Sequence, residues 1–258
     1  MVMKDIEKRL IEKVFTDNKE AYVVSETHAF GADLKAIPEW LELTREDKIL
    51  DVATGGGHVA KTLSPYVKQV YAIDLTKEML AEARKHLENF QNIHFIIGEA
   101  EDLPFLDHTF DHIICRTAAH HFTSPRHFIE EVTRVLKPGG SFLLIDNISP
   151  EAHSLDTFVN SFEKMRDNSH HRALKISEWK HLFQKNQLSI YKEKPRKKTL
   201  PFDDWLHRTQ HDRYMRQHVS NFVLGANHEV LNHFQIDIRE QRIHSIALDE
   251  WMVLVKKE

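Results

Sequence analysis

The sequence has little of several features that define special protein classes. Its single cysteine, Cys115, excludes a disulfide within the chain. A signal peptide and an apolar run long enough to span a bilayer are both missing, so we expect a cytoplasmic protein without integral membrane association. Basic residues are not in excess. With 35 Lys and Arg against 39 Asp and Glu, the formal net charge is −4, which disfavours nucleic acid as a partner.

Glycine is also scarce, with eight among 258 residues, yet three of them are consecutive. Gly55, Gly56 and Gly57 follow a predicted apolar strand at residues 49–53 and precede a predicted helix. Glycine lets the backbone turn tightly and approach a ligand closely. The start of a helix adds unpaired N–H groups at the positive end of the helix dipole. This segment therefore predicts a site for an anionic or carboxylate-bearing ligand.

Apolar strands and helices alternate from residue 48 onward. The predicted strands cover residues 49–53, 70–73, 93–97, 110–115 and 141–145. One helix starts at 58, Thr76 can cap a second, and Ser124-Pro125 begins a third, which ends at residues 137–140. Five strands alternating with helices predict an open α/β fold, with a mostly parallel sheet, right-handed crossovers and helices on both faces.

The segments on either side of this region are expected to cover it. Residues 3–15 and 31–43 show helical spacing of apolar side chains and are interpreted as a lid, which could bring Tyr22, Ser25 or His28 over the site. After Pro150 we expect two helices, a strand that runs into a basic stretch, polar helical pieces and a closing hairpin. Their predicted ranges are 154–165, 177–184, 188–192, 202–234, and 242–248 with 251–256 around Asp249-Glu250.

These segments predict one domain over residues 1–258. We divide it into an N-terminal helical lid (1–44), a core that binds the ligand (45–148), and a substrate-side half (149–258) with a helical insertion at about 200–234. Aromatic residues of the last part are interpreted as core, namely Phe158, Phe162, Trp179, Phe183, Trp205, Phe222 and Phe234.

Three acidic residues follow the predicted strands. Asp51 lies at the end of the first strand, Asp74 closes the second, and Glu99 follows the third. In an open α/β sheet, ligands bind beyond the carboxyl ends of the strands. A carboxylate after the second strand suits paired ribose hydroxyls, because it accepts two O–H donors. The pattern Gly55-x-Gly57-x-x-Ala60 with Asp74 also fits a nicotinamide dinucleotide, so these residues alone leave the cofactor open.

The order of five motifs is more specific. Asp51-x-Ala53-x-Gly55-x-Gly57 is followed by Asp74, the loop 98–105, Phe110-Asp111 and the segment 131–140. Together they closely resemble the class I S-adenosylmethionine-dependent methyltransferases, and most of all the small-molecule branch with the ubiquinone and menaquinone biosynthesis C-methyltransferases. The resemblance covers roughly residues 45–148. It implies a Rossmann-like fold, with a seven-stranded, mostly parallel sheet and a reversed C-terminal hairpin, and S-adenosyl-L-methionine as the cofactor.

The resemblance also implies roles by matched position. The methionine end of the cofactor would be held by Asp51, Ala53, Thr54, Gly55 and Gly57, and its ribose by Asp74. The adenine would lie against Leu75, Met79, Glu99 and Ala100, while Arg116 and Thr117 would face the methionine portion or the methyl group. Ala53 stands where most members have glycine, and an alanine is tolerable there if its φ is negative.

The reaction implied is methyl transfer to an oxygen, carbon or nitrogen of a small molecule by in-line displacement. The protein then mainly orients the reactants and excludes water. A histidine suits removal of the acceptor's proton at neutral pH. His120 and His121 follow the fourth strand directly, and we expect one of them to line the acceptor pocket, with Asp146 and Asn147 as further candidates. Asp167, His170 and His171 are weighed as lid-side residues but interpreted as a solvated loop.

Four alternatives were weighed. His207 and His211 could share a metal ion from one helix face, but no cysteine cluster or His-Glu-x-x-His pattern supports this. The basic residues Lys192, Lys194, Arg196, Lys197 and Lys198 lack interleaved aromatics and are interpreted as a solvated strand end. An NAD(P)-dependent oxidoreductase is disfavoured, because no Tyr-x-x-x-Lys pair follows the fourth strand. A non-catalytic cofactor-binding module stays open.

Overall fold

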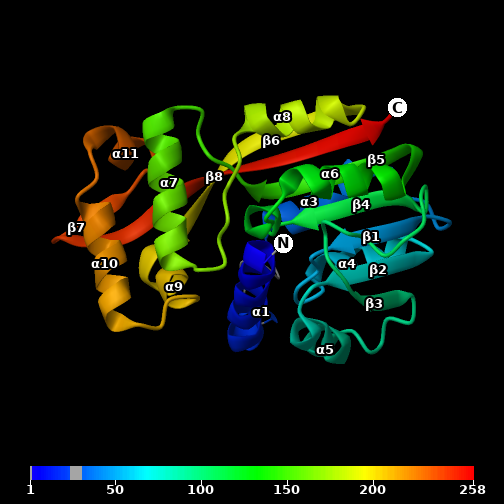
Figure 1. Cartoon of the computed structure of the whole chain (residues 1–258), viewed down its shortest axis with the longest axis horizontal. Coiled ribbons are helices and arrows are strands. Elements are labelled where there is room, and N and C mark those ends of the chain that lie inside the picture. Colours follow the sequence, from blue (N-terminus) through cyan, green and yellow to red (C-terminus); the bar gives the residue numbers. More distant parts are fainter. Residues whose placement is uncertain (1, 24–30) are drawn as a thin grey trace.

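The computed structural model describes residues 2–23 and 31–258, and within them the chain forms an eight-stranded sheet. The strand order is β3-β2-β1-β4-β5-β8-β6, and β7 pairs with β8 outside this path (Figure 1). The parallel strands are β1 (Lys48–Val52), β2 (Gln69–Asp74), β3 (Ile93–Ile97), β4 (Phe110–Arg116) and β5 (Leu136–Asn147). The C-terminal strand β8 (Arg242–Lys257) is antiparallel to β5, β6 (Leu188–Pro201) and β7 (Asp237–Arg239). The Rossmann-like fold is thus confirmed, with one short strand more than expected.

Helices cover both faces of the sheet. Successive residues of a strand point to opposite sides, so a strand that is apolar throughout gives the sheet two apolar faces that must be covered. In β4, Ile113 and Cys115 belong to one buried cluster and Ile114 to the other. The first cluster includes residues of α6 (Pro125–Val135) and α8 (Ile176–Lys185), and the second includes residues of α3 (Ala32–Trp40) and α4 (His58–Leu63). A further helix, α5 (Lys77–His86), contacts β2 and β3. Two short 3-10 helices are η1 (Ser64–Tyr66) and η2 (Ala119–His121).

The turn predicted at Asp249-Glu250 is wrong, although the C-terminal strands are antiparallel as expected. Residues 242–257 form one continuous strand, which is antiparallel to β6 and to β7. The two acids expected at the turn have partners in the sheet region. Glu250 is fully buried and pairs with Arg196, and Asp249 accepts hydrogen bonds from Lys197 and His233. These charges therefore stabilise the interior of a strand instead of marking a turn.

The long strands β6 and β8 extend beyond the main sheet into a second lobe (Figure 1). There they pack with α7 (His153–Arg166), α9 (Phe202–His207), α10 (Arg213–Leu224) and α11 (His228–His233) around a third buried cluster. Six of the seven aromatic residues interpreted as core are indeed buried, while Phe222 is 36% exposed and stacks on Phe158. The basic stretch expected at a solvated strand end lies inside β6, where Arg196, Lys197 and Lys198 face acidic partners.

The N-terminal helix α1 (Val2–Val23) lies between the two lobes (Figure 1). Its residues contact α5 on one side, and the Asn18 side chain accepts a hydrogen bond from His211 of the second lobe on the other. Ser25 and His28 lie outside the described residues, as does the side chain of Tyr22.

Two local details differ from expectation. Thr76 is the N-cap of α5, but its side chain makes no capping hydrogen bond. The strand expected at 141–145 already begins at Leu136. Ser124 does cap α6, since its side chain accepts a hydrogen bond from the His127 amide.

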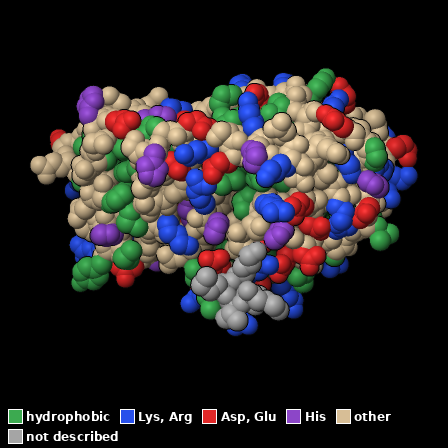
Figure 2. All heavy atoms as spheres, turned by 45° about the horizontal axis from the view of Figure 1, so that its top comes forward, with side chains coloured by type: hydrophobic (Ala, Val, Ile, Leu, Met, Phe, Trp, Pro, Cys, Tyr) green, Lys and Arg blue, Asp and Glu red, His purple; other side chains and the backbone are tan. Residues whose placement is uncertain are grey.

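On the face shown in Figure 2, Lys and Arg side chains are interspersed with Asp and Glu, so no large area of one charge is visible there. Among residues 2–23 and 31–258, no helix combines the length and the apolar character that crossing a bilayer requires.

Candidate active site

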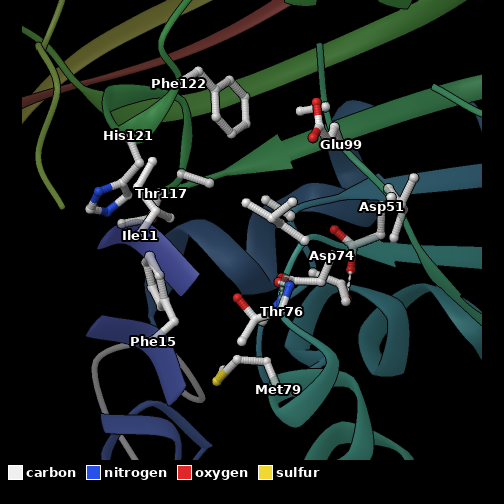
Figure 3. A pocket seen from close by; sticks show the side chains of 18 of the residues that line it. Ile11, Phe15, Asp51, Asp74, Thr76, Met79, Glu99, Thr117, His121 and Phe122 are labelled. Atoms are coloured by element: carbon white, nitrogen blue, oxygen red, sulfur yellow. Dashed lines mark hydrogen bonds between the residues drawn. The ribbon is translucent and has the colours of Figure 1, made fainter. Parts of the chain in front are cut away.

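A cleft opens at the carboxyl ends of β1, β2 and β4, between the glycine turn and α1 (Figure 3). It encloses about 1100 Å³ of space not filled by protein atoms, including its opening to solvent. Asp51, Asp74 and Met79 lie on one side of it, while Ile11, Phe15 and His121 lie on the other (Figure 3). Most of the residues proposed from the sequence line this cleft, namely Asp51, Ala53, Thr54, Gly55, Asp74, Leu75, Met79, Glu99, Ala100, Arg116, Thr117 and His121. Gly57, His120 and Asp146 are not on its wall.

The turn after β1 has three residues with positive φ, namely Ala53 (54°), Gly55 (52°) and Gly57 (78°). A Cβ on Gly57 would lie 2.5 Å from Cδ1 of Leu87, so only glycine fits there without movement. The condition of a negative φ at Ala53 is therefore not met. An L-residue in this region is strained because its Cβ approaches the following carbonyl oxygen.

Asp51 is held beneath the turn. One carboxylate oxygen, Oδ2, accepts a hydrogen bond from Thr54 Oγ1 at 2.6 Å and another from the Ala60 amide at 3.1 Å. Burial raises the pKa of Asp51 to about 7, although these two hydrogen bonds oppose the shift. A buried carboxyl group that titrates near neutrality favours a positively charged ligand, which would stabilise its ionised form.

Asp74 links the glycine turn to the start of α5. Its Oδ2 accepts from the Gly55 amide and its Oδ1 from the Thr76 amide, both at 2.9 Å. Burial raises the pKa of this carboxyl group against the effect of these hydrogen bonds. A carboxylate has about four acceptor positions, so each oxygen keeps capacity for a further donor. Leu75 and Met79 continue the cleft wall beside it.

Two more acids stand at the end of β3. Glu99 forms an ion pair with Lys8 of α1, and Glu101 accepts hydrogen bonds from Thr123 Oγ1 at 3.0 and 3.1 Å. The Lys8 ammonium lies 3.8 Å from the Glu101 carboxylate as well. Sequence reasoning missed Lys8, Ile11 and Phe15, although the helical spacing of residues 3–15 was visible. That spacing shows an apolar face, but not what the face covers.

The end of β4 carries a buried ion pair and a strained residue. Arg116 pairs with Asp33 of α3. Burial would raise the pKa of Asp33, but the Arg116 guanidinium outweighs this effect and lowers the pKa to about 2. Thr117 has φ of 55°, which is an outlier for a β-branched residue. Its buried Oγ1 has no hydrogen-bond partner among the described residues. Strain and an unsatisfied hydroxyl at a cleft wall are typical of a functional position.

The two adjacent histidines have different surroundings. His120 lies behind the wall, where its ring Nδ1 is 2.6 Å from Asp146 Oδ1 and its amide donates to Asp146 Oδ2 at 3.0 Å. Burial alone would lower the pKa of His120, but the Asp146 carboxylate raises it above its usual value. His121 reaches the cleft, and burial together with the nearby His120 charge lowers its pKa to about 4. His121 is therefore a neutral base at pH 7.

The loop after α7 is only partly solvated. Asp167 and His170 are buried, contrary to expectation, whereas His171 is exposed, as expected. Asp167, Ser169 and His170 are each at most 3% exposed. The Ser169 hydroxyl lies 3.1 Å from His121 Nδ1, although 48 residues separate the two in the sequence. Ser169 was not a candidate, because no local pattern links it to β4.

The other candidates lie elsewhere. His207 ends α9 and His211 follows it, so the two do not share a helix face. Among the described residues, no group of three His, Cys, Asp or Glu side chains could hold a metal ion. Residues 149–258 contribute no lining to this cleft, so the insertion at 200–234 lies outside it.

Comparisons with known proteins agree with this geometry. A family model described as a methyltransferase domain matches residues 50–144. YcgJ of Bacillus subtilis (strain 168), an uncharacterized methyltransferase, is 40% identical over 199 residues, which are 76% of this chain and 79% of that protein. The crystal structure of the B. subtilis YcgJ protein matches with a TM-score of 0.85 and 34% identity, covering 87% of this chain and 97% of that one.

Similarity also extends to enzymes with a named acceptor. A demethylmenaquinone methyltransferase of Thermotoga maritima is 33% identical over 140 residues, which are 52% of this chain and 59% of that protein. These matches favour the methyltransferase interpretation over the oxidoreductase. The chain belongs to the class I S-adenosylmethionine-dependent methyltransferases.

Proposed function

We propose that this cleft binds S-adenosyl-L-methionine and that the protein transfers its methyl group to a small-molecule acceptor. One observation carries the proposal. The acids that end three neighbouring strands, Asp51, Asp74 and Glu99, line a single cleft whose opposite wall is apolar and holds a neutral histidine.

The residues present fit the cofactor in charge and in the groups that they offer to it. The cleft wall carries four acids, Asp51, Asp74, Glu99 and Glu101, against the cations Lys8 and Arg116. This excess of negative charge suits a ligand with an ammonium and a sulfonium group. We assign the ammonium to Asp51, the ribose hydroxyls to Asp74, and the adenine to the surface formed by Leu75, Met79 and Ala100. The glycine turn lets backbone N–H groups approach the ligand carboxylate.

The cofactor supplies an activated methyl group. The chain then has three tasks, namely to orient the acceptor, to exclude water and to take a proton from the acceptor. Ile11 and Phe15 of α1 and Phe122 after β4 provide apolar surface on the cleft wall. Their position suggests a compact, largely apolar acceptor. His121 is the base that we assign to its proton.

The acceptor is proposed as a small molecule with an ionisable O–H, C–H or N–H group. The names of the relatives support this class, since they include demethylmenaquinone methyltransferases. Nucleic acid is not proposed, because the wall facing the ligand carries more acids than bases.

The test is acceptor-dependent release of S-adenosylhomocysteine from purified protein. Phenols, quinols and small amines are offered with S-adenosylmethionine, and transfer RNA serves as a contrasting acceptor. We expect release with at least one small molecule, none with RNA, and none in the Asp74→Ala variant. Binding of S-adenosylmethionine without release for any acceptor would instead support a non-catalytic module.

A further inference from the structure

We propose that Asp167 and Ser169 form a hydrogen-bonded relay that holds His121 in the tautomer protonated at Nδ1, leaving Nε2 free to take the acceptor's proton. This rests on the proposed function, since it assigns positioning residues to the same site. It extends that function by giving a role to the loop after α7, which lies outside the cofactor-binding core at residues 45–148.

The hydrogen atoms of the relay follow from its donors and acceptors. Asp167 Oδ1 accepts the Ser169 amide at 2.9 Å and also the Ser169 hydroxyl. An ionised carboxylate can only accept, and its other oxygen lies 3.6 Å from the Arg166 guanidinium. Because the hydroxyl proton is directed at Asp167, the oxygen of Ser169 must accept from its other neighbour, His121 Nδ1, at 3.1 Å. The proton of the neutral imidazole therefore lies on Nδ1.

The Ser169 hydroxyl contact uses Nδ1 and not Nε2. The backbone of Ser169 also forms a hydrogen bond with this imidazole. His121 lines the cleft (Figure 3). Phe15 of α1 packs edge-on against the imidazole, with ring centroids 5.1 Å apart. A phenyl ring has no N–H or O–H group, so Phe15 offers no donor that competes for the imidazole nitrogens.

The segment is pinned against η2 by its backbone. The amides of His171 and Arg172 both donate to the His120 carbonyl, at 2.9 and 3.0 Å. The Asp167 amide donates to the Glu163 carbonyl of α7 at 2.8 Å. Asp167, Ser169 and His121 are 1%, 3% and 6% exposed, so water does not compete for these bonds. Such fixed partners are what a tautomer-selecting relay needs.

Burial and the charge of His120 keep His121 neutral before the reaction, although the carboxylates of Asp167 and Asp146 oppose them. His120 with Asp146, and Asp167 with Arg166, are the charged groups packed around it. The low pKa of His121, caused by burial and then by the His120 charge, agrees with this. Two adjacent histidines with opposite pKa shifts are typical of divided acid–base roles.

The proton balance is simple. With an O–H acceptor, the O–H bond breaks and its proton goes to Nε2 of His121, while its electron pair forms the new bond to the methyl carbon. The sulfur–methyl bond breaks with its electrons left on sulfur. His121 then carries a positive charge, which the Asp167 carboxylate stabilises through Ser169. The proton is later lost to solvent.

The experiment is NMR of ¹⁵N-labelled histidine side chains in the full chain, with and without S-adenosylhomocysteine. The His121 signals are assigned by their loss in His121→Asn. We expect the Nδ1–H tautomer in the wild type and the Nε2–H tautomer as the major form in Ser169→Ala. We expect the Nε2–H tautomer in Asp167→Ala as well, because the Ser169 hydroxyl then has no carboxylate to donate to and can donate to Nδ1 of His121. Ser149→Ala is the matched control, since it removes a buried hydroxyl that donates to Asp156 at 2.6 Å without touching a histidine.

An Nε2–H tautomer in the wild type would overturn the relay, and so would an unchanged tautomer in Ser169→Ala. If Ser169→Ala fails to fold, the wild type and Asp167→Ala decide. Calorimetry with S-adenosylhomocysteine separates the two proposals. We expect Ser169→Ala to bind it within twofold of the wild type, whereas no binding by the wild type would contradict the proposed function and leave the tautomer result intact.

Discussion

Two cleft residues other than glycine, Ala53 and Thr117, have left-handed backbone conformations. Such conformations persist only where the surrounding structure imposes them. At Ala53, the Thr54 amide donates to the Ile73 carbonyl and the Gly57 amide to the Thr54 carbonyl, which fixes the turn. At Thr117, the amide donates to the Ile145 carbonyl at 2.7 Å. Neighbouring strands thus hold both residues in a shape that their side chains disfavour.

Ala53→Gly is expected to stabilise the protein. It removes a left-handed penalty of about 1–2 kcal/mol at the cost of about 0.5–1 kcal/mol of backbone entropy, so the free energy of unfolding should rise by about 0.5–1 kcal/mol. Urea denaturation measures this. Ala60→Gly in α4 is the control and should be destabilising, because glycine is unfavourable inside a helix. Equal destabilisation by both variants would contradict the strain at Ala53.

Asp51 makes cofactor affinity depend on pH. Its folded pKa of about 7 is raised, so the carboxyl group is largely protonated at pH 6 and ionised at pH 8. A cationic ligand prefers the ionised form, so its binding releases a proton and tightens as pH rises through 7. We expect calorimetry with S-adenosylmethionine to give up to about tenfold tighter binding at pH 8 than at pH 6. In Asp51→Asn the profile should be flat, and an equally steep profile there would assign the effect to another group.

The same raised pKa destabilises the protein without ligand. Because the folded state holds this proton more tightly than the unfolded state, the stability that Asp51 contributes is lost as pH rises from 3.8 towards 7. Asp51→Asn should therefore unfold at a higher temperature than the wild type at pH 8 while binding the cofactor more weakly. That combination distinguishes a functional carboxylate from a structural one.

Among the elements, α1 is the part of the cleft that the sequence motifs do not explain. It is bound to both lobes, through Lys8 with Glu99 and through Asn18 with His211, and it places Ile11 and Phe15 on the cleft wall. A helix held by an ion pair and a few side chains can open more easily than the sheet.

Phe15→Ala is expected to weaken binding of S-adenosylhomocysteine by about tenfold, since loss of an aromatic wall leaves apolar surface open to water. Calorimetry measures the change. Ile6→Ala on the same helix is the control, because Ile6 is 60% exposed and does not line the cleft. If Phe15→Ala binds as tightly as the control, α1 is not part of the binding wall.

The strands and helices of the core could be predicted because their residues alternate with the period of each element. The error at Asp249-Glu250 has a clear cause. Adjacent acids between apolar runs normally indicate a turn, but here Arg196 and Lys197 on β6 neutralise them across the sheet. Pairing between strands about 50 residues apart is a tertiary contact that local patterns do not show.

For the whole molecule, the motifs located one half of the site better than the other. Residues that follow β1 and β2 converge because parallel strands end at one edge, which the order of elements predicts. The opposite wall comes from α1, and the buried relay comes from the segment after α7. Those contributions depend on how separate parts of the chain pack. The sequence analysis therefore included Asp167 among the candidates, but could not show that Ser169 connects it to His121.

The second lobe shows the same limit. Most of its aromatic residues are buried as predicted, although Phe222 is 36% exposed. We expected residues 149–258 to cover the core, and the lobe builds its own buried cluster at the far ends of β6 and β8. Composition predicts that such residues are buried, but not on which side of the sheet they gather.

The most direct test of the account is calorimetric titration of the whole chain with S-adenosylmethionine and S-adenosylhomocysteine, with NAD(H) and NADP(H) as contrasting ligands. We predict micromolar binding of the first two and none of the nicotinamides. Asp74→Ala should weaken binding by about 100-fold, since two charge-assisted hydrogen bonds are lost. Asp107→Ala, which removes a largely exposed aspartate, should bind as the wild type does. Binding of a nicotinamide cofactor instead, or equal affinity in Asp74→Ala, would contradict the proposed site.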